Sequence, residues 1–266
     1  MNAAAALLAA SRRIDRFDAE VLLAHRGGAD RLAMLAGPDR DIDAAAYDAL
    51  VGRRASGEPA AYITGRREFW SLDLAVTPDV LIPRPDSETL IEAALQARAG
   101  RPPATILDLG TGSGALLLAA LSEFPRARGL GIDRSPAALA VARSNADRLG
   151  FARRAAFATG DWGAGVRGRF DLVLANPPYV ETGADLSPEV RREPAEALFA
   201  GADGFDDYRR LVPQLPGLLA VGGVAVIEIG HTQAAAVAML AAAAGLSGRV
   251  AKDLGGRDRC LVLDAN

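Results

Sequence analysis

From residue 104 onward, short apolar runs alternate with segments in which apolar positions recur every three or four residues. The apolar runs predict strands at 105–109, 129–132, 155–158, 170–175 and 224–229, with a last pair near 249–251 and 260–263. The intervening segments predict helices at 113–123, 135–149, 205–220 and 232–244, of which Pro213 and Pro216 should interrupt the third. Strands that alternate with helices are typical of a doubly wound α/β sheet.

The first 75 residues have a different pattern. Apolar positions such as Ile14, Phe17 and Val21 recur at helical spacing, and Asp43 is a suitable cap for a helix over 44–54. Basic and acidic residues nearly balance in this part of the chain. The pattern predicts a solvated helical bundle.

A short region of strand-like alternation follows the helices. Apolar and polar residues alternate over 68–76, a turn is expected at 77–79, and Val80-Leu81-Ile82 resumes the pattern. Pro83 and Pro85 end it, and Asp86-Ser87-Glu88 opens a helix. We therefore predict a helical domain over 1–75, a β-hairpin and linker over 76–85, and an α/β domain over 86–266.

Composition excludes several classes of protein. The net charge of −3 does not favour a broad nucleic-acid surface, and 29 of the 30 basic residues are Arg, which indicates a base-composition bias of the genome. A single cysteine, Cys260, and two distant histidines, His25 and His231, predict neither a disulfide nor a metal site. No stretch reaches membrane-spanning length, and the apolar run 3–10 lacks the basic region of a signal peptide. We expect a cytoplasmic monomer.

The segment Asn176-Pro177-Pro178-Tyr179 directly follows the predicted strand 170–175. Two prolines cannot continue a strand ladder, so the chain should form a stiff, open turn at the carboxyl end of the strand, where open α/β sheets bind ligands. Such a turn presents the Asn176 amide, a backbone carbonyl and the Tyr179 ring. This arrangement suits a planar NH2 group, which needs two hydrogen-bond acceptors and a flat wall. A surface turn without a function is the alternative.

A glycine-rich loop joins the first strand of the sheet to its first helix. Gly110-Thr111-Gly112-Ser113-Gly114 follows Asp108-Leu109, and the glycines let the backbone turn tightly beside a ligand. Asp133 ends the second strand, where it could hold ribose hydroxyls, and Asp161 and Trp162 follow the third strand, where they could border an adenine. The loop also fits the dinucleotide fingerprint. The acidic Asp108 before the glycines is typical of S-adenosylmethionine enzymes, and no hydride-transfer partner is evident near the strand ends.

Several motifs together make the chain resemble the release-factor glutamine methyltransferase family (HemK/PrmC). Asn-Pro-Pro-Tyr after the fourth strand is shared by methyltransferases that act on planar amino groups. The further motifs that resemble this family are Gly57-Glu58-Pro59, Tyr62-Ile63-Thr64-Gly65, Glu68-Phe69, Val80 to Pro85, Glu193-Pro194 through Leu198, Gly201 to Gly204, and Gly255 to Arg259. One departure is that the family usually reads Arg-Pro-Glu-Thr-Glu where this chain has Arg84-Pro85-Asp86-Ser87-Glu88.

The resemblance implies a seven-stranded, Rossmann-like sheet whose last strand is antiparallel. It also implies methyl transfer from S-adenosylmethionine to the glutamine of the Gly-Gly-Gln loop in class-1 peptide chain release factors, and a helical domain that recognises the substrate protein. Gly110 to Gly114, Asp133, Asp161, Trp162 and Asn176 would hold the cofactor, and Asn176 to Tyr179 would hold the glutamine.

Three other functions fit parts of the pattern. An adenine-N6 methyltransferase acting on DNA or RNA would use the same four residues, but it needs a flipped base and a recognition surface, and the chain has no basic insertion. A nicotinamide-dependent oxidoreductase would fit the glycine spacing, but this chain lacks the proton donor that such an enzyme needs. A non-catalytic adaptor is opposed by the intact Asn-Pro-Pro-Tyr.

Overall fold

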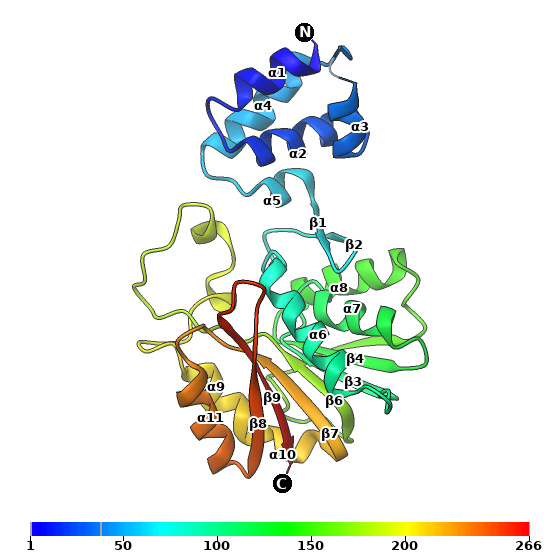
Figure 1. Cartoon of the computed structure of the whole chain (residues 1–266), viewed down its shortest axis with the longest axis vertical. Coiled ribbons are helices and arrows are strands. Elements are labelled where there is room, and N and C mark those ends of the chain that lie inside the picture. Colours follow the sequence, from blue (N-terminus) through cyan, green and yellow to red (C-terminus); the bar gives the residue numbers. More distant parts are fainter. Residues whose placement is uncertain (1, 38, 266) are drawn as a thin grey trace. The chain divides into compact units, whose positions relative to one another are not determined.

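A computed structural model describes residues 2–37 and 39–265, which divide into two compact units (Figure 1). The first unit comprises Met1–Arg66 together with the short segment Leu186–Arg192. The second comprises Arg67–Asp185 and Glu193–Asn266. The hairpin residues that the sequence analysis grouped with the helices thus belong to the unit that contains the sheet.

The first unit is helical. Its helices are α1 (Ala3–Ala10), α2 (Arg16–Gly27), α3 (Arg31–Ala36), α4 (Ala44–Ala55) and α5 (Ala60–Thr64). Asp43 caps α4 as predicted, because its carboxylate accepts from the Ala46 N–H at 3.1 Å. Leu22 and Leu23 of α2 are buried in the core of the unit, and the Tyr47 hydroxyl donates to the Ala19 carbonyl at 2.8 Å. Within the described residues, no helix has the length and apolar character needed to span a bilayer.

The segment 186–192 packs on the helices of this unit. Arg54 of α4 donates to the carboxylates of Asp18 and Glu189, and Arg192 donates to the Ser56 carbonyl at 2.8 Å. These contacts tie a piece of chain that follows Asn-Pro-Pro-Tyr by only a few residues to the helical unit.

The hairpin lies earlier than predicted. It consists of β1 (Arg66–Phe69) and β2 (Leu72–Ala75), joined by Trp70 and Ser71, which have positive φ values of 51° and 59°. Val80-Leu81-Ile82 does not form a strand, which corrects the expectation that it would resume the hairpin. The physical reason is that the Ile82 N–H donates to the buried Glu193 carboxylate at 2.9 Å, and Pro83 follows directly.

The second unit contains a seven-stranded sheet, as predicted. Its order is β5-β4-β3-β6-β7-β9-β8, in which β9 is antiparallel to both of its neighbours and the other pairs are parallel. The strands are β3 (Thr105–Leu109), β4 (Arg128–Asp133), β5 (Ala155–Thr159), β6 (Phe170–Ala175), β7 (Leu219–Glu228), β8 (Leu246–Lys252) and β9 (Asp258–Ala265). The reversed last strand is therefore confirmed.

Helices cover both faces of this sheet (Figure 1). They are α6 (Glu88–Ala97), α7 (Ala115–Glu123), α8 (Pro136–Arg148), α9 (Asp206–Leu211), α10 (Leu215–Leu218) and α11 (Ala234–Ala243). The helix predicted over 205–220 is interrupted at its prolines and ends earlier, because β7 begins at Leu219. Short 3₁₀ turns of this unit occupy Pro85–Ser87, Ala195–Ala197 and Val212–Gln214, and a further one, Val190–Arg192, belongs to the first unit.

The central position of β6 in the sheet explains why every residue of this strand after Asp171 is apolar. Leu172 and Leu174 pack into the core on the face covered by α6 and α7, whereas Val173 and Ala175 pack on the opposite face with α9 and α11. Asp171 is held at the start of the strand, where its carboxylate accepts from the Ala104 and Thr105 N–H groups at 2.9 and 3.0 Å. This anchoring places residue 176 at the carboxyl edge of the sheet.

Candidate functional site

A cleft lies at the carboxyl edge of the sheet in the second unit. Most of the residues that the sequence analysis selected line it, namely Gly110, Thr111, Gly112, Ser113, Asp133, Asp161, Trp162, Asn176 and Pro178. Gly114, Pro177 and Tyr179 were also selected but are not among its lining residues. Strand ends far apart in sequence thus meet around one cavity.

The glycine loop wraps around the start of the cleft. Gly110, Gly112 and Gly114 have φ values of 75°, 54° and 83°, which side-chain-bearing residues rarely adopt. A Cβ on Gly110 would lie 3.1 Å from the indole of Trp162, so the close approach of loop and indole also requires glycine there. Gly114 lies at the start of α7, which explains why it supports the loop without facing the cleft.

Asp108 is fully buried below the glycine loop. The Thr111 hydroxyl donates to its Oδ2 at 2.6 Å, whereas Oδ1 has no hydrogen-bond partner among the residues that the structure describes. Burial raises the pKa of this carboxyl to about 7, against the stabilising hydrogen bond from Thr111. A buried, half-satisfied carboxyl is thus held beneath the loop.

Asp133 connects the glycine loop to the start of α8. Its carboxylate accepts from the Gly112 N–H at 2.8 Å and from the Ser135 N–H at 2.9 Å. A carboxylate has about four acceptor positions, so these two bonds leave capacity for ligand hydroxyls in the cleft.

Trp162 adopts a left-handed backbone conformation, with a φ of 51°, beside Gly110. Its indole N–H donates to the Asp207 carboxylate at 3.3 Å. Asp161 forms an ion pair with Arg210. Backbone strain at a bulky cleft residue is a feature of functional sites, and it supports the selection of Trp162 from the sequence.

The turn Asn176–Tyr179 has buried prolines and a half-buried asparagine. The Asn176 Nδ2 donates to the hydroxyl of Ser87 at 3.3 Å. Within the described part of the chain, neither Asn176 Oδ1 nor the Pro177 carbonyl accepts a hydrogen bond. Two acceptors therefore lie next to each other in sequence without a protein donor, as a planar NH2 group requires.

The loop that contains Gly201 to Gly204 holds the end of this turn. The Val180 N–H donates to the Leu198 carbonyl at 3.0 Å, and Gln233 donates to the Tyr179 carbonyl at 3.2 Å. Gly204 has a φ of 75°, and a Cβ there would lie 2.6 Å from the Tyr179 carbonyl oxygen. The glycine motif is thus explained by its close approach to the turn.

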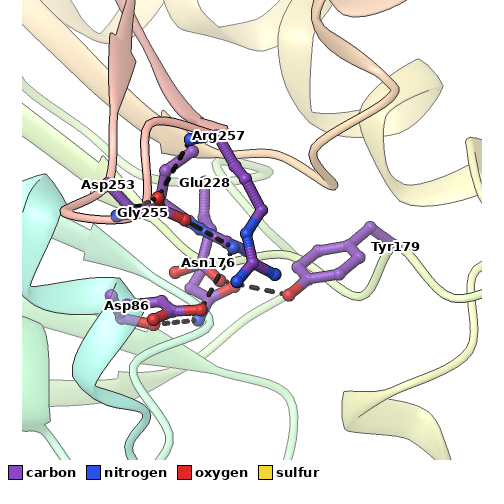
Figure 2. A network of polar contacts seen from close by, with 9 residues as sticks. Asp86, Asn176, Tyr179, Glu228, Asp253, Gly255 and Arg257 are labelled. Carbon is purple, nitrogen blue, oxygen red and sulfur yellow. Dashed lines mark hydrogen bonds and ion pairs between the residues drawn. The ribbon is translucent and has the colours of Figure 1, made fainter.

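Figure 2 shows the Tyr179 hydroxyl directed at the carboxyl of Glu228, which lies at the end of β7. The distance from this hydroxyl to Glu228 Oε1 is 3.3 Å. Arg259 completes the network by pairing with Asp253 at 3.0 Å and with Asp86 at 3.1 Å. Asp86, at the departure from the family pattern, therefore has an ion-pair role in this structure.

Sequence reasoning missed four residues of the site and its supports: Ser87, Glu193, Asp207 and Glu228. Glu193 is fully buried and binds both the Ile82 N–H and the Arg84 guanidinium, which fixes the Val80–Pro85 segment beside the cleft. The family motifs contained Ser87 and Glu193 but gave them no role. The sequence signal for Asp207 and Glu228 was weak. Each is an acidic residue among apolar neighbours, Asp207 in a predicted helix and Glu228 at the end of a predicted strand.

Replacement of Glu228 by glutamine should alter how stability depends on pH. Burial raises the pKa of this carboxyl to about 7, while the Ser87 hydroxyl, Arg259 and Tyr179 lower it and Asp86 raises it. Because the folded pKa exceeds the unfolded one, the associated stability is present below the unfolded value of 4.5 and is lost as the pH rises through about 7. Between pH 5 and 8, the unfolding free energy of Glu228→Gln should gain on that of the wild type by on the order of 1–2 kcal/mol. Urea unfolding of both proteins across this range measures the difference, and a difference that stays constant with pH would contradict the prediction.

Comparison with known proteins identifies both parts of the chain. Residues 1–65 match the family model described as PrmC N-terminal domain, and residues 102–207 match the model described as Methyltransferase domain. A solved ribosomal protein L11 methylase from Lactobacillus delbrueckii subsp. bulgaricus superposes with a TM-score of 0.55 at 21% identity, over 72% of this chain and 84% of that one. This likeness confirms the methyltransferase fold.

Relatives at higher identity cover almost the whole chain. A release factor glutamine methyltransferase from Rhodospirillum rubrum is 49% identical over 93% of this chain and 78% of its own length. Another, from Moorella thermoacetica, is 45% identical over 93% of this chain and 90% of its own length. The cofactor is S-adenosylmethionine, as predicted, and the glycine loop, the spare acceptor capacity of Asp133 and the indole of Trp162 fit it. The chain belongs to the release factor glutamine methyltransferase family.

Proposed function

We propose that this protein transfers a methyl group from S-adenosylmethionine to the side-chain amide nitrogen of the glutamine in the Gly-Gly-Gln loop of class-1 peptide chain release factors. The observation that carries this proposal is the pair of free acceptors at Asn176 Oδ1 and the Pro177 carbonyl, held at the edge of the cleft. Two neighbouring acceptors match the two hydrogens of a primary amide.

The cofactor, when bound, supplies an electrophilic methyl group. Gly110 to Ser113, Asp133, Asp161 and Trp162 would hold it. The task left to the protein is to place a poor nucleophile, because the lone pair of an amide nitrogen is delocalised into its carbonyl. Asn176 and Pro177 bind both amide hydrogens and favour the pyramidal nitrogen, which stabilises the charge that develops on it.

No side chain in the site needs to remove a proton before the transfer. Alkylation makes the nitrogen acidic, so the proton can leave afterwards to solvent. Tyr179 is unsuited to act as a base, because burial and the neighbouring Glu228 raise the pKa of its hydroxyl. Its ring is half-buried at the turn, where it would pack against the plane of the substrate amide.

The helical unit is proposed to recognise the release factor, and residues 1–65 match the family model of the PrmC N-terminal domain. We further propose that the protein acts as a monomer in the cytoplasm and forms no stable complex with nucleic acid. The net charge of −3 supports the last of these proposals, the absence of a stable complex with nucleic acid, since it provides no general attraction for a polyanion.

Incubation with S-adenosylmethionine labelled on its methyl group tests the proposed function. The label should appear on the Gly-Gly-Gln peptide of a purified release factor, as a mass increase of one methyl group on the glutamine. A release factor whose motif glutamine is changed to glutamate should remain unlabelled, because a carboxylate offers no NH2 group. Label on adenine in duplex or single-stranded DNA, with none on the release factor, would favour the adenine methyltransferase and overturn the proposal.

A further inference from the structure

The groups that line the cleft come from four neighbouring strand ends, and their order follows the order of the strands. β6, β3, β4 and β5 lie side by side in the sheet. Their carboxyl ends lead to Asn176, the glycine loop, Asp133 and Trp162, respectively, which all contribute to the lining of the cleft. An extended cofactor whose methyl group lies at Asn176 and whose ribose lies at Asp133 therefore has its adenine at the Trp162 end.

The Trp162 end of the cleft also contains the carboxylate of Asp207, which α9 contributes. The Trp162 indole N–H donates to Asp207 Oδ1 at 3.3 Å, and Arg210 of the same helix pairs with this oxygen at 3.5 Å. Among the residues that the structure describes, none donates a hydrogen bond to Oδ2. Two donors thus occupy one oxygen of the carboxylate, and the other oxygen is an open acceptor beside the indole.

Asp161 is the other carboxylate at this end of the cleft, and it is less suited to select a ligand. Its side chain is 57% exposed and pairs with Arg210, whereas the side chain of Asp207 is 12% exposed. A hydrogen bond to an exposed carboxylate replaces one to water and contributes little to affinity. A sheltered carboxylate discriminates more strongly, because a ligand without a matching donor leaves it without a partner.

We propose that Asp207 is a specificity-determining residue whose Oδ2 accepts a hydrogen bond from the exocyclic amino group of adenine in S-adenosylmethionine. An ionised carboxylate can only accept, so it binds this NH2 group and repels a base that has a carbonyl oxygen at the same position. The inference goes beyond the proposed function, because it concerns the cofactor and does not depend on which substrate is methylated.

Calorimetric binding of two analogues, measured without any methyl acceptor, tests this assignment. S-adenosylhomocysteine has the amino group, and S-inosylhomocysteine has a carbonyl oxygen in its place. Wild type should bind the adenosyl compound at least about tenfold more tightly than the inosyl compound. Asp207→Ala should bind the adenosyl compound about tenfold more weakly than wild type does, whereas its affinity for the inosyl compound should not fall.

Asp207→Asn gives the sharper result, because it keeps the shape of the side chain. Trp162 and Arg210 are both donors, so they hold the asparagine oxygen at the position of Oδ1 and leave its NH2 group at the position of Oδ2. An NH2 group there donates to the inosyl carbonyl and opposes the amino group of adenine. The preference for the adenosyl compound should therefore fall at least about tenfold, and the affinity for the inosyl compound should rise.

Asp206→Asn is the matched control, because it removes the same charge from the preceding residue of α9. The Asp206 side chain is 59% exposed and pairs with Arg209, so the preference of this variant should stay within about twofold of wild type. An unchanged preference in Asp207→Asn, or equal weakening of both compounds, would overturn the inference. A fall of equal size in Asp206→Asn would also overturn it, since the effect would then be one of general charge. Methylation of the release factor does not enter these measurements, so the inference and the proposed function fail independently.

Discussion

Replacement of Asn176 by alanine is expected to lower the rate of methyl transfer by roughly two to three orders of magnitude. The variant lacks one of the two acceptors for the substrate amide, which leaves an NH without a partner and the nitrogen poorly aimed. Folding should survive, because Asn176 lies at a strand end and is half-buried, with only a 3.3 Å bond to Ser87 to lose. Cofactor binding should fall less than the rate, since the glycine loop and Asp133 remain.

The measurement is single-turnover transfer to a purified release factor, read by mass on the Gly-Gly-Gln peptide. Asn176→Asp is the informative companion, and it should be milder than Asn176→Ala because a carboxylate still accepts hydrogen bonds. Near wild-type turnover in Asn176→Ala would mean that the turn at 176–179 is only structural. The proposed assignment of the acceptor pair would then be wrong.

Asp133→Ala is expected to weaken binding of S-adenosylmethionine by on the order of 1–3 kcal/mol, or about tenfold to more than a hundredfold in Kd. The variant lacks the carboxylate that we assign to the ribose hydroxyls. It also lacks the acceptor for the Gly112 and Ser135 N–H groups, so the glycine loop should become less ordered. Titration calorimetry measures the effect directly.

Asp133→Asn separates the two contributions of this residue. The asparagine oxygen can still accept one backbone hydrogen bond, but its NH2 group cannot accept from a ribose hydroxyl. Affinity should therefore lie between those of the wild type and Asp133→Ala. Wild-type affinity in Asp133→Ala would show that the ribose is held elsewhere in the cleft.

The sheet and its ligand-binding edge could be predicted from sequence because each depends on local signals. Apolar runs such as 105–109 and 170–175 are long enough to be identified as strands, and both lie where predicted. The glycine loop and the double proline also have few alternative conformations, so their positions at strand ends followed directly. The count of seven strands in one sheet and the reversal of its last strand came from the family resemblance, because strand pairing is not encoded locally.

The supports of the site could not be predicted in the same way. Glu193 contacts Ile82 across 111 positions of sequence, and Asn176 contacts Ser87 across 89, so no local pattern links these residues. The Val80–Ile82 segment was wrongly predicted as a strand because its apolar residues resemble one. The Val80 N–H donates instead to the Thr77 carbonyl, and the Ile82 N–H donates to the Glu193 carboxylate. Whether backbone N–H groups bond to a neighbouring strand or to other groups is decided by tertiary structure alone.

The position of β9 has a consequence for how the protein is made. This strand follows β7 and β8 in the chain but lies between them in the sheet, and it contributes Arg259 to the network around Glu228. While a ribosome is still synthesising residues 229–257, the apolar edge of β7 has no neighbour and β8 has nothing to pair with. Such an edge is open to association with other chains, which favours occupancy by a chaperone during translation. The ion pairs of Arg259 with Asp86 and Asp253 thus form only after the ribosome has translated the chain as far as β9, late in synthesis.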